Sequence, residues 1–275
     1  MRVENGHGKN KPNIRKFAEN DMADGFNSDG LDCESGGQKK TVKVGTRGSM
    51  LALAQTELVI KALKERFSQI DFQMITMSTR GDRDTSRALL EFGGKAVFVE
   101  EFEEAILKGD IDIAVHSAKD MPMEIMEGLT ISGTLPRACP QDVLIYKSGR
   151  SFDRNESFVV GTSSLRRQYQ IRDMYRNAEC KNLRGNVGTR IQKLEDGEYD
   201  AIILAAAGLE RLGVIEDKGN DSTECFEVHK DELTFRYIST ESMLPAACQG
   251  IIAIETRTSG CLLYTSPSPR DRSLS

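Results

Sequence analysis

The sequence predicts an α/β protein made of two units, each with a sheet covered by helices. Short, nearly continuous apolar segments alternate with segments in which apolar residues recur at helical spacing, and this alternation is typical of parallel sheets with both faces covered. The alternation breaks at residues 136–141 and then resumes. A chain of 275 residues has room for two domains of ordinary size.

The first unit is expected to begin at Thr41. A glycine-containing turn at residues 45–49 separates the first expected strand from a helix in which Leu51, Ala54 and Leu58 share one face. The other features follow from the same alternation. The expected strands are residues 42–44, 72–77 and 111–116, the expected helices are residues 51–63 and 99–108, and polar or glycine-containing loops are expected at residues 79–86 and 91–95.

The second unit is expected to follow Pro140. Its expected strands are residues 143–146, 158–160, 201–204 and 251–254, and its expected helices are residues 163–176, 187–194, 205–212 and part of 238–248. Ser163 or Ser164 is expected to cap the first of these helices, because a serine hydroxyl can accept a hydrogen bond from an unpaired N–H of the first turn.

The two ends of the chain differ in composition from the middle. Residues 1–40 contain few apolar residues and no apolar periodicity, so we expect a disordered extension there. This segment lacks the apolar stretch of a secretory signal and is too acidic for a typical transit peptide. Residues 258–275, TSGCLLYTSPSPRDRSLS, are rich in Ser, Pro and Arg, so we expect a disordered tail unrelated to the rest of the protein.

Composition and charge argue against several classes of protein. The chain has 37 Lys and Arg against 42 Asp and Glu, a net charge of −5, whereas nucleic-acid-binding proteins usually carry a basic field. Its longest apolar run, residues 201–209, is too short to span a bilayer. The 6 cysteines and 3 histidines lack metal-ligand spacing, and scattered cysteines are typical of a reducing compartment. We expect a cytoplasmic protein without a metal site, with a plastid as the alternative location.

Cationic residues gather where the expected strands end. In open α/β sheets this edge forms the ligand crevice, and helix N-termini there add unpaired N–H groups. Several arginines in an acidic chain predict a small ligand with several carboxylates, because the planar guanidinium pairs well with carboxylate. Taken singly, each arginine is better explained as solvated surface, and only their joint placement supports a site. The residues are Arg47, Lys119, Arg166, Arg167, Arg184 and Arg190.

One acidic residue stands among these cations. An apolar strand leads directly to Lys119 and Asp120, in a loop that Pro122 stiffens. Nearby cations favour the ionised form of Asp120, which could stabilise a developing positive charge or transfer protons. A structural Lys–Asp pair at a strand end is the alternative, and spacing alone favours it.

Seven segments of the chain, in order, resemble one enzyme family. They are VGTRGSMLALAQ, GGKAVFVEEFEEAI, DIAVHSAKDMP, GTSSLRRQ, LRGNVGTR, AIILAAAGLERLG and LPAACQG. Together they resemble the porphobilinogen deaminases, also called hydroxymethylbilane synthases, over about residues 42–257. The resemblance implies a transferase of tetrapyrrole and heme biosynthesis that condenses four porphobilinogen units into hydroxymethylbilane and releases ammonia. It also implies a monomer with a dipyrromethane cofactor attached covalently to a cysteine.

The same resemblance implies a fold and a set of site residues. Two periplasmic-binding-protein-like domains would face a cleft, with residues 41–136 and 238–257 in the first and residues 137–237 in the second. Asp120 would be the catalytic carboxylate that stabilises the positively charged pyrrole formed as ammonia leaves. Arg47, Ser49 and Gln55 match the incoming-substrate side. The positions that match cofactor binding are Lys119, Ser163, Arg166, Arg167, Arg184, Asn186 and Arg190.

The C-terminal end departs from the family pattern. The family's third domain, an α+β domain that carries the cofactor cysteine, is not recognisable after residue 257. Cys261 comes too early and Cys248 lies in the LPAACQG segment, so the attachment cysteine is not identifiable. We therefore expect that the 275-residue chain makes no hydroxymethylbilane.

Two alternatives to a working enzyme stay open at this point. The chain could be an inactive fragment, or it could be a two-domain module that binds anionic solutes. A solute-binding module is expected to have a secretory signal and does not need Asp120. Porphobilinogen is the expected partner, and neither a nucleic acid nor a membrane is expected.

Overall fold

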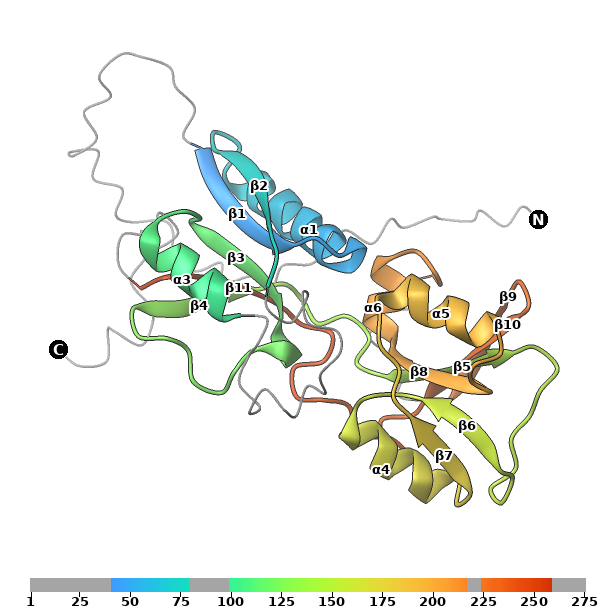
Figure 1. Ribbon diagram of the computed structural model, residues 1–275. Helices are drawn as coiled ribbons and strands as arrows, with labels where there is room; N and C mark the ends of the chain where they lie inside the picture. The colour runs from blue at the N-terminus through green and yellow to red at the C-terminus, as the bar shows by residue number, and fades with distance from the viewer. Residues whose placement is uncertain (1–40, 80–98, 217–223, 259–275) are drawn as a thin grey trace, which may run out of the picture.

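The computed structural model describes residues 41–79, 99–216 and 224–258, which form two sheets with helices packed on them (Figure 1). The expected α/β class is confirmed. The expected extension at residues 1–40, the loop at residues 91–95 and nearly all of the loop at residues 79–86 lie outside the described residues, as does the tail from residue 259 onward.

The first sheet is mixed and has five strands. These are β1 (Thr41–Arg47), β2 (Asp71–Met77), β3 (Ile113–Ser117), β4 (Leu129–Thr134) and β11 (Ile252–Arg257). Their order is β2-β1-β3-β11-β4. β1 is parallel to β2 and β3, whereas β11 is antiparallel to β3 and β4. The helices α1 (Met50–Arg66) and α3 (Glu100–Lys108) contact this sheet.

The second sheet is mixed and has six strands. These are β5 (Asp142–Lys147), β6 (Phe158–Gly161), β7 (Ala178–Lys181), β8 (Ala201–Ala205), β9 (Phe226–Lys230) and β10 (Leu233–Ile238). Their order is β7-β6-β8-β5-β10-β9. The accompanying helices are α4 (Leu165–Met174), α5 (Val187–Glu195) and α6 (Ala206–Arg211). We call the two sheets with their helices the first and second lobes.

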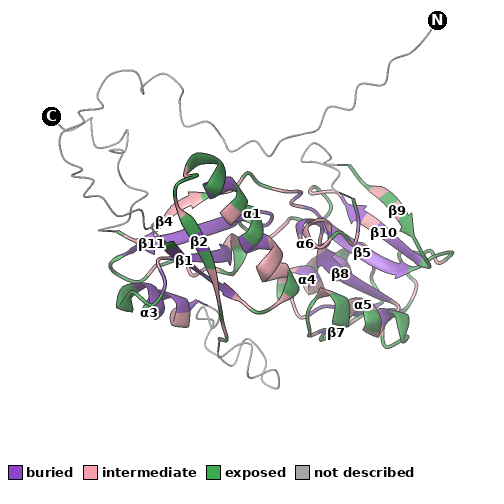
Figure 2. Ribbon diagram, turned by 90° about the horizontal axis from the view of Figure 1, so that it is seen from above, coloured by how far each residue is buried: buried purple, intermediate pink, exposed green. Residues whose placement is uncertain are grey.

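Apolar side chains from the sheets and helices form the core of each lobe. In the first lobe, Val44 and Ile113 of neighbouring strands are buried in one cluster with Val59 of α1. In the second lobe, Ile202 of β8 is buried with Leu194 of α5. Figure 2 shows the central strands buried and the outer helix faces exposed. Burial on both faces explains why the central strands are apolar almost throughout.

The expectation of parallel sheets is wrong in part. β5 pairs antiparallel with β8 and β10, and β9 and β10 form an antiparallel hairpin. The hairpin turn contains Asp231 at φ 55°, a conformation that Asp tolerates better than most residues. Buried strands of either direction have the same apolar composition, so the apolar pattern alone did not reveal strand direction.

The helix expected within residues 238–248 is also absent from the described structure. Residues 239–251 form turns between β10 and β11. The Ser239 hydroxyl oxygen accepts a hydrogen bond from the Ser242 N–H at 3.2 Å, Pro245 has no N–H to donate, and Cys248 adopts φ 57°. These local features favour turns over a helix.

The chain passes between the two lobes through two segments that lie side by side. The first crossover is residues 135–141, between β4 and β5, and the second is residues 239–251. The Ala138 N–H donates to the Gly250 carbonyl at 3.1 Å, and Arg137 Nε donates to the Gln249 carbonyl at 2.8 Å. The two crossovers therefore act as one paired connection.

Replacing Gly250 by Ala is expected to disrupt this pairing. Gly250 has φ +91°, and a Cβ there would collide with the carbonyl oxygen of Ala138. We expect Gly250→Ala to lower the free energy of unfolding by about 2–3 kcal/mol, measured by urea denaturation. Gly149→Ala is the control, because Gly149 has φ +81° but open space around it. It should cost only about 1 kcal/mol, the backbone penalty. Equal losses would show that the contact with Ala138 is unimportant.

Candidate functional site

The turn that follows β3 holds Lys119 and Asp120 at the edge of the first sheet. η2 (Ala118–Asp120) is a short 3₁₀ turn directly after the buried strand. The Ala118 N–H donates to the Ile251 carbonyl at 3.0 Å, so the turn is attached to the second crossover. Lys119 and Asp120 are both exposed to solvent.

Lys119 lies where the two lobes face each other. Burial lowers the pKa of Lys119, Asp120 acts to raise it, and Arg167 of the second lobe lowers it further. Asp142 and Arg166, also of the second lobe, act on the same ammonium. Lys119 has accessible surface and is nevertheless desolvated, as expected for a group that protein surrounds on several sides without covering it.

Arg190 of α5 approaches the same place from the second lobe. Burial lowers the pKa of the Arg190 guanidinium, and the positive charges of Arg167 and Arg184 lower it further, whereas Asp120 acts to raise it. The carboxylate of Asp120 therefore acts on cations from both lobes. We call Lys119, Asp120, Arg166, Arg167 and Arg190 the interlobe cluster.

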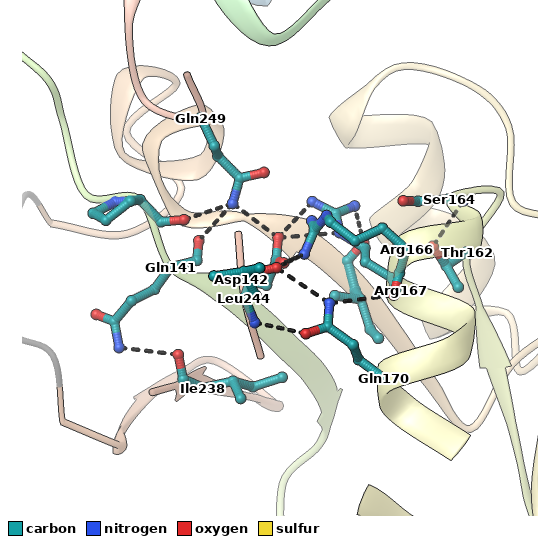
Figure 3. A network of polar contacts seen from close by, with 12 residues as sticks. Gln141, Asp142, Thr162, Ser164, Arg166, Arg167, Gln170, Ile238, Leu244 and Gln249 are labelled. Carbon is teal, nitrogen blue, oxygen red and sulfur yellow. Dashed lines mark hydrogen bonds and ion pairs between the residues drawn. The ribbon is translucent and has the colours of Figure 1, made fainter. Parts of the chain in front are cut away.

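Arg166 and Arg167 share one buried carboxylate (Figure 3). Arg167 Nη2 and Nε donate to Asp142 Oδ1 at 2.7 and 3.1 Å, and Arg167 Nη1 donates to the Ile203 carbonyl at 2.9 Å. Arg166 Nη1 lies 2.7 Å from Asp142 Oδ2. Burial acts to raise the pKa of Asp142, but Arg167 and Arg166 outweigh it and lower the pKa. Asp142 is therefore ionised and neutralises one of the two cations.

The two arginines differ in exposure, although they are adjacent in sequence. The Arg167 side chain is 9% exposed and the Arg166 side chain is 24% exposed. Arg167 thus contributes positive charge from within the fold, whereas Arg166 presents part of its guanidinium to solvent.

Ser163 and Asn186 organise the backbone next to these arginines. The Ser163 hydroxyl donates to the Leu183 carbonyl at 3.0 Å and accepts from the Leu183 N–H at 3.1 Å. Asn186 caps α5, since its side-chain oxygen accepts from the Thr189 N–H at 2.9 Å. The expected serine cap of α4 is wrong: Ser164 occupies the N-cap position, but its side chain makes no capping bond, and the Ser163 hydroxyl is used by Leu183.

The turn from Arg184 to Asn186 orients Arg190 of the interlobe cluster. Arg190 Nε donates to the Gly185 carbonyl at 2.7 Å, so the guanidinium is oriented by the turn between Arg184 and Asn186. Arg184 is half-buried in that turn. The segment from Leu183 to Arg190 therefore orients Arg190 through its own backbone and carries Arg184 in the same turn.

The three residues expected on the substrate side lie at the end of β1 and the start of α1. Arg47 is the last residue of β1, and Ser49 caps α1 by accepting from the Ala52 N–H at 3.3 Å. Gln55 is buried, and its Nε2 donates to Ser117 Oγ at 3.0 Å. Because Ser117 ends β3 directly before η2, Gln55 is connected to the turn that carries Lys119 and Asp120.

Sequence reasoning missed Asp142 and Gln249, which complete the site. Gln249 Nε2 donates to Asp142 Oδ1 at 3.0 Å, and both residues are buried. A signal was present for Asp142, because a carboxylate at the start of a fully apolar strand requires a cation nearby. No comparable signal identified Gln249.

The donor set suits a group with several carboxylates. The interlobe cluster holds four cations and one acidic residue, Asp142 neutralises one charge, and Arg184 adds another. Among the residues that the structure describes, no three His, Cys, Asp or Glu are grouped so as to hold a metal ion. Of the described cysteines, Cys139 is buried, Cys180 is half-buried, and Cys225 and Cys248 are exposed. Cys33 and Cys261 lie outside the described residues.

The fold and the cationic site between its lobes define a two-lobed α/β protein that binds an anionic ligand between two mixed sheets. The family model described as "Porphobilinogen deaminase, dipyromethane cofactor binding domain" matches residues 42–262. The chain belongs to the porphobilinogen deaminase family. It is therefore a transferase of tetrapyrrole and heme biosynthesis, a hydroxymethylbilane synthase with porphobilinogen as substrate and a dipyrromethane cofactor.

Individual relatives agree with the family model. The porphobilinogen deaminase of Streptococcus sanguinis is 42% identical over 220 residues, which cover 79% of this chain and 68% of that protein. The porphobilinogen deaminase of Bacillus velezensis is 43% identical over 221 residues, which cover 80% of this chain and 66% of that protein. The chain thus spans about two thirds of the length of these relatives.

Solved structures show a more distant likeness. The periplasmic VFT2 domain of BvgS from Bordetella pertussis is 16% identical with a TM-score of 0.44, over 79% of this chain and 80% of that chain. Within the described part of the chain, no helix is long and apolar enough to cross a membrane.

Proposed function

We propose that Asp120 is the catalytic carboxylate of the porphobilinogen deaminase reaction and that the cations around it bind the carboxylates of substrate and cofactor. The main support for this proposal is that the charge of Asp120 acts to raise the pKa of Lys119 beside it and the pKa of Arg190 on the other lobe. A single exposed carboxylate among cations from both lobes suits a ligand that is itself anionic at its edges and becomes cationic at its reacting carbon.

Asp120 stabilises the positive charge that develops as ammonia leaves porphobilinogen. The C–N bond of the aminomethyl group breaks, the electron pair leaves with nitrogen, and the positive charge spreads from the carbon into the pyrrole ring. A carboxylate held in place before the reaction lowers the free energy of this state without reorganisation. Bound dipyrromethane supplies the pyrrole to which units are added.

Different cations bind different carboxylates of the substrate and the cofactor. Lys119, Arg166, Arg184 and Arg190 hold acetate and propionate groups, and Arg167 contributes charge from within the fold. Ser163 and Asn186 act on binding by fixing the backbone at Leu183 and Thr189. Arg47 receives the incoming porphobilinogen at the end of β1, while Ser49 and Gln55 fix the start of α1 and the Lys119–Asp120 turn.

Incubation with porphobilinogen tests the proposed function. A form of the enzyme that carries the covalent cofactor, here called cofactor-loaded enzyme, should release ammonia and form hydroxymethylbilane, whereas the 275-residue chain alone is expected to form none. Protein without the covalent cofactor should still bind the substrate's carboxylates. Loss of both binding and turnover would contradict the proposal and favour the inactive fragment, and binding of unrelated anions in preference to porphobilinogen would favour a solute-binding module. A cytoplasmic location and a monomeric state stay predictions.

Ligand binding is expected to weaken as Lys119 loses its proton. A suitable probe is a porphobilinogen analogue with methyl in place of the aminomethyl group, here called the methylpyrrole analogue, because it cannot release ammonia. A bound carboxylate raises the pKa of Lys119, so binding should take up protons at alkaline pH. Because burial lowers the pKa of Lys119 in the free protein, affinity should begin to fall with rising pH below the ordinary lysine value of about 10.4.

Titration calorimetry in buffers of different ionisation enthalpy measures this proton uptake. Lys119→Met should bind the methylpyrrole analogue more weakly and lose the alkaline uptake. Lys108→Met is the control, because Lys108 pairs with Glu104 at 2.9 Å on the surface of α3. Undiminished uptake in Lys119→Met would mean that Lys119 does not contact the ligand's carboxylates.

A further inference from the structure

The carboxylate of Asp142 joins parts of the molecule that are far apart in sequence. Asp142 is fully buried and is the first residue of β5, directly after the first crossover. Its Oδ1 accepts hydrogen bonds from Arg167 and from Gln249 of the second crossover, and its Oδ2 pairs with Arg166 (Figure 3). One carboxylate therefore contacts both arginines and both connections between the lobes.

Gln249 fixes the crossovers to each other and to this carboxylate. Besides its bond to Asp142, Gln249 Nε2 donates to the Pro140 carbonyl at 2.6 Å. The Gln249 carbonyl accepts from Arg137 Nε at 2.8 Å, and Gln141 Nε2 donates to the Ile238 carbonyl at 3.1 Å. A change in the relative path of the two crossovers would therefore move the Asp142 carboxylate or break its bond to Gln249.

Asp142 and the second crossover also hold one end of the Arg166 guanidinium. Arg166 Nη1 lies 2.7 Å from Asp142 Oδ2 and donates to the carbonyl of Leu244, in the second crossover, at 2.6 Å. Gln170 also binds Leu244, accepting from its N–H at 2.7 Å. Nε and Nη2 of Arg166 make no hydrogen bond with any residue that the structure describes. These donors remain available to a ligand, in a direction that Asp142 and the second crossover set.

We propose that Asp142 is a positioning residue, which together with Gln249 couples the paired crossovers to the direction of the Arg166 guanidinium. Arg166 then faces the ligand's carboxylate at a fixed place relative to Asp120 on the other lobe. This inference rests on the proposed function, because it assumes that Arg166 binds a carboxylate of the ligand. It assigns to Asp142 no contact with the ligand or with the reacting atoms.

The alternative role for Asp142 predicts an effect of opposite sign. If Asp142 only neutralised Arg166, its negative charge would compete with the ligand, and removing that charge would strengthen binding of an anion. If Asp142 positions Arg166, removing its charge frees the guanidinium to turn away and binding weakens. The direction of the change in affinity therefore separates the two roles.

The test measures the dissociation constant of the methylpyrrole analogue for wild type and Asp142→Asn by titration calorimetry. We expect a dissociation constant at least tenfold higher in Asp142→Asn, and a smaller rise in Asp142→Glu, which keeps the charge. In cofactor-loaded enzyme, KM for porphobilinogen should rise more than kcat falls. Unchanged or tighter binding by Asp142→Asn would overturn the proposal.

A control separates positioning from a general loss of stability. Asp200 pairs with Arg150 at 2.6 Å and accepts from the Val159 N–H at 2.7 Å in the same lobe, away from the crossovers. Asp200→Asn should lower the melting temperature and leave the dissociation constant unchanged. An equal loss of affinity in Asp200→Asn would show that Asp142 acts only through stability, which overturns the proposal.

A second variant keeps the test decisive if Asp142→Asn does not fold. Gln249→Met removes the bonds to Asp142 and Pro140 while keeping the length of the side chain, and we expect about a threefold rise in the dissociation constant. Unchanged binding by Gln249→Met would then overturn the proposal. Failure of wild type itself to bind the methylpyrrole analogue would instead contradict the proposed function, so the two failures are distinguishable.

Discussion

Asp120→Asn should reduce kcat of the cofactor-loaded enzyme by about 10²–10³-fold, the usual cost of removing one group that stabilises transition-state charge. The exchange keeps the shape of the side chain and removes its negative charge. That charge is most useful when the substrate carbon becomes positive as ammonia leaves, so the loss belongs to the transition state. In the ground state the ligand is anionic, so the affinity for the methylpyrrole analogue should be unchanged or slightly higher.

Steady-state kinetics with porphobilinogen and calorimetry with the methylpyrrole analogue provide the two measurements. Glu124→Gln is a matched control, because Glu124 is an exposed carboxylate four residues along the same chain segment. It should change neither kcat nor affinity. A normal kcat in Asp120→Asn would remove the catalytic role from Asp120, and a large loss of affinity without loss of kcat would make Asp120 a binding residue.

Arg167→Met should lower the free energy of unfolding by about 3–5 kcal/mol, because it leaves the Asp142 carboxylate in the interior without its main partner. Arg167 provides two of the hydrogen bonds to Asp142 and one to Ile203. Removing one partner of a buried pair costs more than the pair contributes, since the remaining charge stays desolvated. Urea denaturation of the protein measures the change.

Arg166→Met is the matched comparison at the same carboxylate. Arg166 is more exposed than Arg167, and its loss leaves Asp142 paired with Arg167. We therefore expect a loss of only about 1 kcal/mol in stability, together with a clear loss of affinity for the methylpyrrole analogue. Equal losses of stability in the two variants would show that the difference in burial does not separate their roles.

The sequence predicted the α/β class and the order of most elements because buried strands and amphipathic helices leave clear patterns. It did not predict strand direction: β8 and β10 both pair with β5 in antiparallel fashion, and nothing in their composition distinguishes them from parallel strands. It also predicted a helix in the second crossover, where Met243 packs into the core of the second lobe, Gly250 accepts a backbone hydrogen bond from the first crossover, and Cys248 takes a positive φ. Tertiary contacts decide both features.

Candidate site residues were easier to identify than their partners. Strand ends and the family resemblance pointed to Asp120, Lys119 and the arginines, but sequence spacing treated Arg166 and Arg167 alike. The structure distinguishes them by burial and by their bonds to Asp142. Gln249 lies 107 residues from Asp142 along the chain, and a single sequence holds no signal that the two residues meet.

The binding of the methylpyrrole analogue and of its dimethyl ester to the wild-type protein tests the central claim most directly. The claim is that cations from both lobes surround Asp120 and bind carboxylates. Each charge-assisted hydrogen bond contributes about 1.5–3 kcal/mol, so the free acid should bind at least about tenfold more tightly than the ester. Added salt should narrow the difference. Equal affinities for acid and ester would contradict the account.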